Sequence, residues 1–158
     1  MPLYTGCVDQ GFKYRKSGLV RVLTMSRLSD ESGKNPRDDL WKGISRGGKF
    51  EFPFDLWNPQ VAPLGRDVAS WYQSKIDWEE FSRRYHASLY ESEKYPFLYK
   101  LVEDAMSQDQ KCPESGLVIQ CVCNLPPGRK TCHRFLLAEE LQNLAFQEFA
   151  YHLEIVHL

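Results

Sequence analysis

The sequence predicts an α/β fold, with a small, mainly parallel sheet flanked by helices in a single domain. Three observations indicate this fold. Segments of strand and helix character alternate, the 158 residues match the usual size of one domain, and 42% of them are hydrophobic. That apolar fraction suffices for a sizeable core and argues against disorder. We therefore treat residues 1–158 as one domain, with a loop-rich segment at about 29–65.

Three segments have the character of strands. Residues 19–28, LVRVLTMSRL, follow Gly18 and are rich in apolar and β-branched side chains. Residues 116–123, GLVIQCVC, form the clearest strand because they are short, apolar and bounded by a glycine. Residues 151–158, YHLEIVHL, alternate well enough to be a last strand. Helical segments separate these strands, and that order favours parallel pairing.

Helical periodicity appears in four segments, at residues 66–75, 77–93, 96–108 and 132–147. In the second, Asp77 is a suitable N-cap, and apolar side chains at spacings of three and four form one face. Pro96 suits the first turn of the third helix. The fourth is expected to bury Phe135, Leu136, Ala138, Leu141, Leu144 and Ala145.

Composition excludes several classes of protein. The formal net charge of -1 provides no global basic field for nucleic acid, although a local basic patch remains open. The N-terminal segment has no apolar run of the signal-peptide type, and no stretch approaches the roughly 20 apolar residues of a membrane helix. The five cysteines are an odd number without framework spacing. We therefore expect a cytoplasmic protein with free thiols and no membrane partner.

Reactive side chains gather in residues 121–134, CVCNLPPGRKTCHR. Cys121 and Cys123 lie at the end of the predicted strand, and Cys132 and His133 open the next predicted helix. In open α/β sheets, ligands bind beyond the carboxyl ends of the strands. A helix N-terminus also attracts anions and lowers the pKa of a thiol. We therefore expect a functional site here.

Four interpretations of this site stay open. In the first, it is an anion site in which Arg134 and backbone N–H groups are the donors. In the second, Cys132 is a nucleophilic or redox thiol. The third is a metal site, and in the fourth the cysteines only pack in the core. No metal is assigned, because Cys-x-Cys followed by Cys-His is not a standard zinc spacing and adjacent residues rarely ligate one ion. Cys123 and Arg129 have the spacing of a tyrosine-phosphatase loop, but the prolines between them remove N–H groups that such a loop requires.

Residues 117–141, LVIQCVCNLPPGRKTCHRFLLAEEL, resemble the signature of the bacterial domain of unknown function 488 family. That signature is a strand ending in a cysteine, a short turn, and Cys-His-Arg opening a helix. The segments ISRGG, VAPLGRDVASWY and DWEEFSRRYHASL are similar to the family's Arg-Gly loop, its Ala-Pro stretch and its aromatic helix. The resemblance spans roughly residues 19–158 and implies an α/β fold with a site at the Cys-His-Arg.

Carried over by position, the resemblance implies site roles for Cys121, Cys132, His133, Arg134, Arg27 and Arg46. Two features depart from the family pattern. Cys123 stands where the family often has an acidic residue, and the turn before Cys132 is longer. A role that requires that carboxylate therefore does not transfer to this chain.

Our leading hypothesis is an anion-binding pocket for a phosphate-bearing small molecule or nucleic acid. Positive charge would come from Arg27, Arg46 and Arg134, and the pocket would include Cys121 and Cys123. For catalysis, Cys132 is the expected nucleophile and His133 the general acid or base. The alternatives are a binding module or accessory protein without catalysis, and a Cys/His metal site. His86 lies off the apolar face of its helix and is expected to be solvated.

Overall fold

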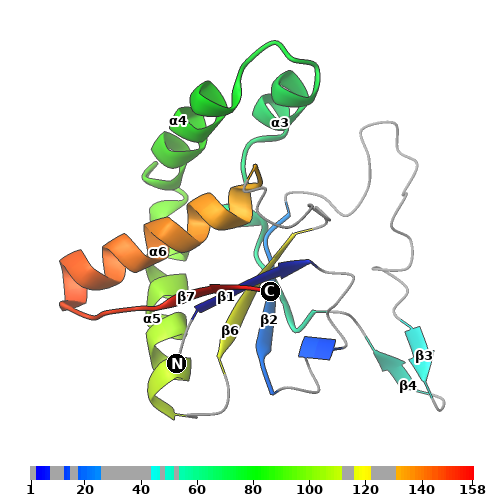
Figure 1. The fold of residues 1–158 in the computed structure, drawn as a ribbon, viewed down its shortest axis with the longest axis vertical. Coiled ribbons are helices and arrows are strands. Elements are labelled where there is room, and N and C mark those ends of the chain that lie inside the picture. The colour runs from blue at the N-terminus through cyan, green and yellow to red at the C-terminus, as the bar shows by residue number, and fades with distance from the viewer. Residues whose placement is uncertain are drawn as a thin grey trace.

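The structure confirms the α/β class, with a mainly parallel sheet flanked by helices (Figure 1). It is a computed structural model that describes residues 3–7, 13–14, 18–25, 44–46, 49–51, 54–111, 116–121 and 131–158. One sheet has the strand order β5-β2-β6-β1-β7, and each strand is parallel to its neighbours. The bounds are β1 Leu3–Cys7, β2 Val20–Leu23, β5 Leu56–Trp57, β6 Leu117–Cys121 and β7 Ile155–His157. A separate antiparallel hairpin pairs β3 Ile44–Arg46 with β4 Lys49–Glu51.

The predicted strands are present, and two of them are shorter than expected. Within 19–28 the strand ends at Leu23, and within 151–158 it covers only Ile155–His157. β1, β5 and the β3–β4 hairpin were not predicted. The β1 sequence LYTGC is polar or small at three of its five positions, and the partners that make it a strand are distant in sequence. β5 has two residues, too few to show a period of two.

All four predicted helices form, at α3 Gly65–Tyr72, α4 Trp78–Leu89, α5 Tyr95–Lys111 and α6 His133–Phe149, and a short 3₁₀ helix, η2, covers Pro59–Val61. Asp77 caps α4 as predicted, because its carboxylate accepts a hydrogen bond from the backbone N–H of Glu80 at 2.8 Å. None of the helices in the described part of the chain is long and apolar enough to cross a bilayer.

The main core lies between the sheet and the helices α4, α5 and α6, which Figure 1 shows gathered on one side. Alternate residues of β6, Leu117 and Ile119, point into this core, and the residue between them, Val118, packs with Tyr14 on the other face. On α6 the prediction that Leu136 is buried is wrong, and the neighbouring leucine is the buried one. Leu137 is fully buried, and Leu136 is only partly buried at the edge of the core.

The close approach of Tyr14 to β1 provides a test of this packing. A Cβ atom at Gly6 would lie 2.5 Å from the Tyr14 hydroxyl oxygen and within 2.7 Å of two ring carbons. Because Tyr14 is buried, we expect Gly6→Ala to lower the free energy of unfolding by about 1–3 kcal/mol. Gly65→Ala is the matched control, since nothing lies within 4 Å of its Cβ and alanine favours a helix. Urea unfolding that ranks the two variants equally would contradict this packing.

Candidate functional site

The carboxyl ends of two adjacent strands meet the beginning of α6. Leu23 of β2 pairs with Gln120 of β6, so the next residues, Thr24 and Cys121, lie side by side at the edge of the sheet. The Thr24 backbone N–H donates to the carbonyl of Gln120 at 3.1 Å and extends this pairing. Cys132 is the N-cap of α6, and no side-chain hydrogen bond caps the helix there. Cys121 and Cys132 therefore lie at the end of a strand and at a helix start, as the sequence predicted.

The backbone of Thr24 determines which nitrogen of His133 carries a proton. His133 Nε2 lies 2.7 Å from the carbonyl oxygen of Thr24, and a carbonyl can only accept a hydrogen bond. Nε2 is therefore protonated. The Thr24 hydroxyl donates to the Gln120 carbonyl at 3.0 Å and can accept from the same Nε2–H at 3.2 Å. In the neutral ring the lone pair is consequently on Nδ1.

The Nδ1 atom of His133 faces two cysteine sulfurs. It lies 3.8 Å from Sγ of Cys121 and 4.0 Å from Sγ of Cys132. The three side chains are buried, with exposed fractions of 8% for His133, 2% for Cys121 and 1% for Cys132. The site therefore combines two thiols with one oriented imidazole, away from bulk water. Such a group can transfer a proton from a thiol or hold a soft metal ion.

Tyr85 of α4 forms the wall behind the imidazole. Its ring meets the His133 ring edge-on, with centroids 5.8 Å apart, and its hydroxyl donates to the carbonyl of Val61 at 2.5 Å. Burial raises the pKa of Tyr85 well above its usual range, and the thiols of Cys132 and Cys121 add to that rise. Tyr85 therefore stays neutral and acts as a packing surface for His133.

Arg134 follows His133 on α6 and is also buried, at 5% exposure. Its guanidinium carbon lies 4.8 Å from the ring centroid of Phe135, within cation–π range. Its charge also acts on Tyr14, whose pKa is raised overall, chiefly by burial, while the charge of Arg134 opposes that rise. Arg134 therefore places positive charge over Phe135, which packs with Cys121 and Cys132.

The structure brings together Cys121, Cys132, His133 and Arg134 of the predicted site residues. Arg27 and Cys123 lie outside the described residues, and Arg46 lies in β3 with its side chain outside the description. Sequence reasoning missed Thr24 and Tyr85 as parts of the site. Tyr85 was recognised only as part of an apolar helix face. The role of Thr24 comes largely from its backbone carbonyl, and because every residue has one, the sequence cannot indicate that role.

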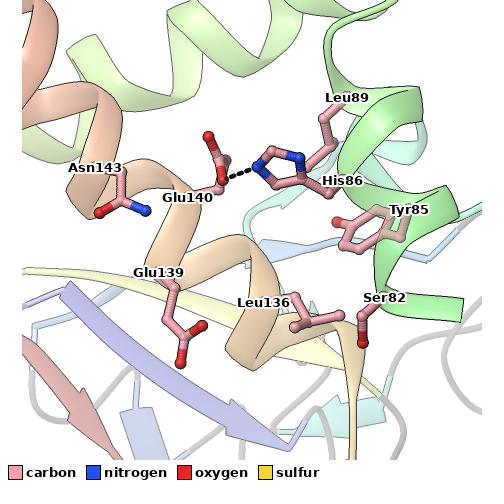
Figure 2. A pocket seen from close by; sticks show the side chains of 8 residues that line it. All are labelled: Ser82, Tyr85, His86, Leu89, Leu136, Glu139, Glu140 and Asn143. Carbon is pink, nitrogen blue, oxygen red and sulfur yellow. Dashed lines mark ion pairs between the residues drawn. The ribbon is translucent and has the colours of Figure 1, made fainter. Parts of the chain in front are cut away.

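A hollow of about 250 Å³ lies between α4 and α6 (Figure 2). It is lined by Ser82, Tyr85, His86, Leu89, Leu136, Glu139, Glu140 and Asn143. Figure 2 shows His86 of α4 reaching to Glu140 of α6, with His86 Nε2 2.6 Å from the carboxylate. The Tyr90 hydroxyl donates to the other oxygen of that carboxylate. The His86 side chain is 61% exposed, as expected of a solvated residue, but it also has this partner. The buried carboxylate thus joins α4 to α6.

We expect Glu140→Gln to lower the free energy of unfolding by about 1–3 kcal/mol, because it removes the negative charge of the carboxylate that His86 and Tyr90 both contact. Glu139→Gln makes the same change at the next position, where the side chain is exposed, and should stay within about 0.5 kcal/mol of the parent protein. Chemical unfolding of both variants near pH 6 measures the difference. Equal losses would show that the α4–α6 contact does not depend on the carboxylate.

Two curated proteins match part of the chain. Malto-oligosyltrehalose trehalohydrolase of Brevibacterium helvolum is 28% identical over 100 residues, which cover 53% of this chain and 17% of that protein. The enzyme of the same name from Rhizobium sp. (strain M-11) is 29% identical over 100 residues with the same coverage. The chain thus matches about 17% of the length of these relatives. No solved structure matches it.

The family model DUF488-N3a, described as the active DUF488-N3 subclade, matches residues 23–145. That range extends from the end of β2 into α6 and contains Thr24, Cys121, Cys132, His133 and Arg134. It covers well over half of the 158 residues, and it agrees with the resemblance carried by the strand cysteine and the Cys-His-Arg helix start. This protein is therefore a member of the DUF488 family, in the active DUF488-N3 subclade.

Proposed function

We propose that this protein binds a phosphate-bearing ligand at the start of α6 and acts on it through Cys132 and His133. The observation that carries this proposal is the placement of three consecutive reactive side chains, Cys132, His133 and Arg134, at the carboxyl end of β6. All three are buried there, at 1%, 8% and 5% exposure. Burial of a thiol, an imidazole and a guanidinium together opposes stability, and such arrangements are typical of functional sites.

The anion-binding part of the proposal is supported by charge. The first turn of α6 has backbone N–H groups without helical acceptors, and the helix has no acidic residue in that turn to occupy them. Arg134 adds a guanidinium, which matches phosphate oxygens in geometry. Arg27 and Arg46 are proposed as further positive groups on the basis of the family resemblance. The ligand class is a phosphorylated small molecule or a nucleic-acid phosphate.

The chemical part of the proposal is supported by the orientation of His133. The Thr24 carbonyl fixes Nε2–H, which directs the Nδ1 lone pair to the sulfurs of Cys121 and Cys132. Two chemistries are open to this arrangement. Cys132 can attack as a thiolate after His133 takes its proton, or the cysteines and the imidazole can act as ligands of a Lewis acid. The second candidate function is phosphate binding without turnover, in which these groups only complete the pocket.

Arg134→Ala tests phosphate binding. We expect it to weaken the binding of inorganic phosphate and of adenosine monophosphate about 10- to 100-fold, because one charge-assisted hydrogen bond contributes roughly 1.5–3 kcal/mol. Arg66→Ala is the control, since it removes the same charge from an exposed position on α3. Isothermal titration calorimetry provides the affinities, and circular dichroism checks folding. Arg134→Gln, which removes the charge and keeps much of the side-chain length, replaces the alanine variant if that one unfolds. Unchanged affinity in a folded Arg134 variant contradicts the anion-binding proposal.

Cys132→Ser separates catalysis from binding. Hydrolysis of a panel of phosphomonoesters and short oligonucleotides is expected to fall at least 100-fold, with phosphate affinity retained. Cys7→Ser serves as the control, because Cys7 is a buried cysteine at the end of the neighbouring strand, paired in register with Cys121. Full turnover in Cys132→Ser would contradict a chemical role for Cys132. A parent protein that binds phosphate but turns over no substrate would favour the binding module.

A further inference from the structure

We propose that Cys121, Cys132 and His133 bind a zinc ion. The ligand atoms of these three residues, two sulfurs and Nδ1, all lie within 4.8 Å of one another. They come from two elements, the end of β6 and the start of α6. This inference concerns the same site as the proposed function. Metal binding itself does not depend on that function, and only the role of the bound ion rests on it.

The spacing of the ligand atoms suits a metal better than a hydrogen bond. Zinc bonds of about 2.3 Å to sulfur and 2.0 Å to nitrogen, at tetrahedral angles, hold sulfur and nitrogen roughly 3.5 Å apart. The observed separations of Nδ1 from the two sulfurs, 3.8 and 4.0 Å, exceed that value by only a few tenths of an ångström. Rotation of the cysteine side chains would have to close this difference when the ion binds. The same separations are long for a hydrogen bond that a thiol donates.

The second partner of the imidazole also fits a metal site. A histidine that binds a metal through one nitrogen almost always donates its other N–H to a carbonyl or carboxylate. His133 does this, because its Nε2–H donates to the Thr24 carbonyl at 2.7 Å and leaves Nδ1 toward the sulfurs. The carbonyl belongs to the end of β2, whose pairing with β6 holds it in place. The ring is therefore already oriented for a ligand at Nδ1.

The charge of the ligands and the softness of their sulfur atoms favour zinc at this site. Two buried thiolates would be costly alone, whereas two thiolates and one divalent cation sum to zero charge. Thiolate sulfur and imidazole nitrogen favour zinc over magnesium or calcium, which prefer oxygen ligands. Both cysteines and the histidine are buried, so this neutral group suits its surroundings.

Among the residues that the structure describes, three ligands are available, and water or a substrate oxygen would take the fourth tetrahedral position, as in catalytic zinc sites. Arg134, the next residue of α6, is buried beside the group and supplies positive charge for an anionic ligand. Cys132 and His133 would then act as ligands, and polarisation of a phosphate oxygen would come from the ion. In this arrangement the phosphate-binding position and the zinc-binding position are adjacent.

The test is metal content and metal affinity of the full chain. The protein is purified without a histidine tag or chelator, and zinc, iron, copper and cobalt are counted by mass spectrometry. We expect about one zinc per chain in the parent protein and in Cys7→Ser, and at least a tenfold loss of zinc affinity in Cys121→Ser, Cys132→Ser and His133→Gln. Cobalt added to the zinc-free protein should give the visible bands of a tetrahedral sulfur-ligated ion.

Circular dichroism and thermal unfolding of each variant show whether a loss of zinc follows from unfolding. If a serine variant does not fold, cobalt spectra of the parent protein decide by themselves whether sulfur and nitrogen ligands are present. Purified parent protein that contains no transition metal and binds neither zinc nor cobalt at micromolar concentration would overturn the proposal. Equal zinc affinity in Cys7→Ser and in all three ligand variants would also overturn it. Phosphate affinity is measured separately on zinc-free protein, so a failure of the anion-binding proposal is distinguishable from a failure of this one.

Discussion

The pairing of β6 with a parallel strand on each side is the constraint on which the site depends. β2 and β1 satisfy the backbone of β6 on both edges, and all five of its side chains are buried. A strand held in this way has no freedom to slide, because a shift of one residue would send Leu117 and Ile119 to the opposite face. Cys121 therefore ends the strand at a fixed height, level with Cys7 of β1 and beside Thr24 after β2.

The hydrogen bond from His133 to the Thr24 carbonyl connects this sheet edge to α6. It joins residues 109 positions apart and is buried, so breaking it would leave a carbonyl and an imidazole N–H without solvent. Tyr85 holds the ring from the α4 side and is itself held by the Val61 carbonyl. The contacts that orient His133 thus belong to the packing of the fold. A substitution that loosens α4 would disturb the imidazole although it touches no sulfur.

The sequence predicted the fold class and the helices well, because local periodicity carries that information. The apolar run of 116–123 indicated β6, and Asp77 marked the start of α4. β1 escaped prediction because it becomes a strand only through β6 and β7, which follow it by more than 100 residues. The candidate site was placed by a general rule, that reactive residues after a strand and at a helix start converge. The rule could not reveal Thr24, since its role depends on a backbone carbonyl and on the register of β2 with β6.

The change of backbone direction at the start of α6 explains why adjacent residues can share one site. In a regular strand, the side chains of Cys132 and His133 would point to opposite faces. Cys132 is extended, with φ -144° and ψ 142°, and His133 is the first helical residue, so the chain turns between them. Sγ of Cys132 consequently comes within 4.0 Å of Nδ1 of His133, on the same side as Cys121. The typical spacings of zinc motifs separate neighbouring ligands by two or more residues. At a helix start the backbone turn supplies the convergence that longer spacing supplies elsewhere, so adjacency by itself does not exclude a shared ion.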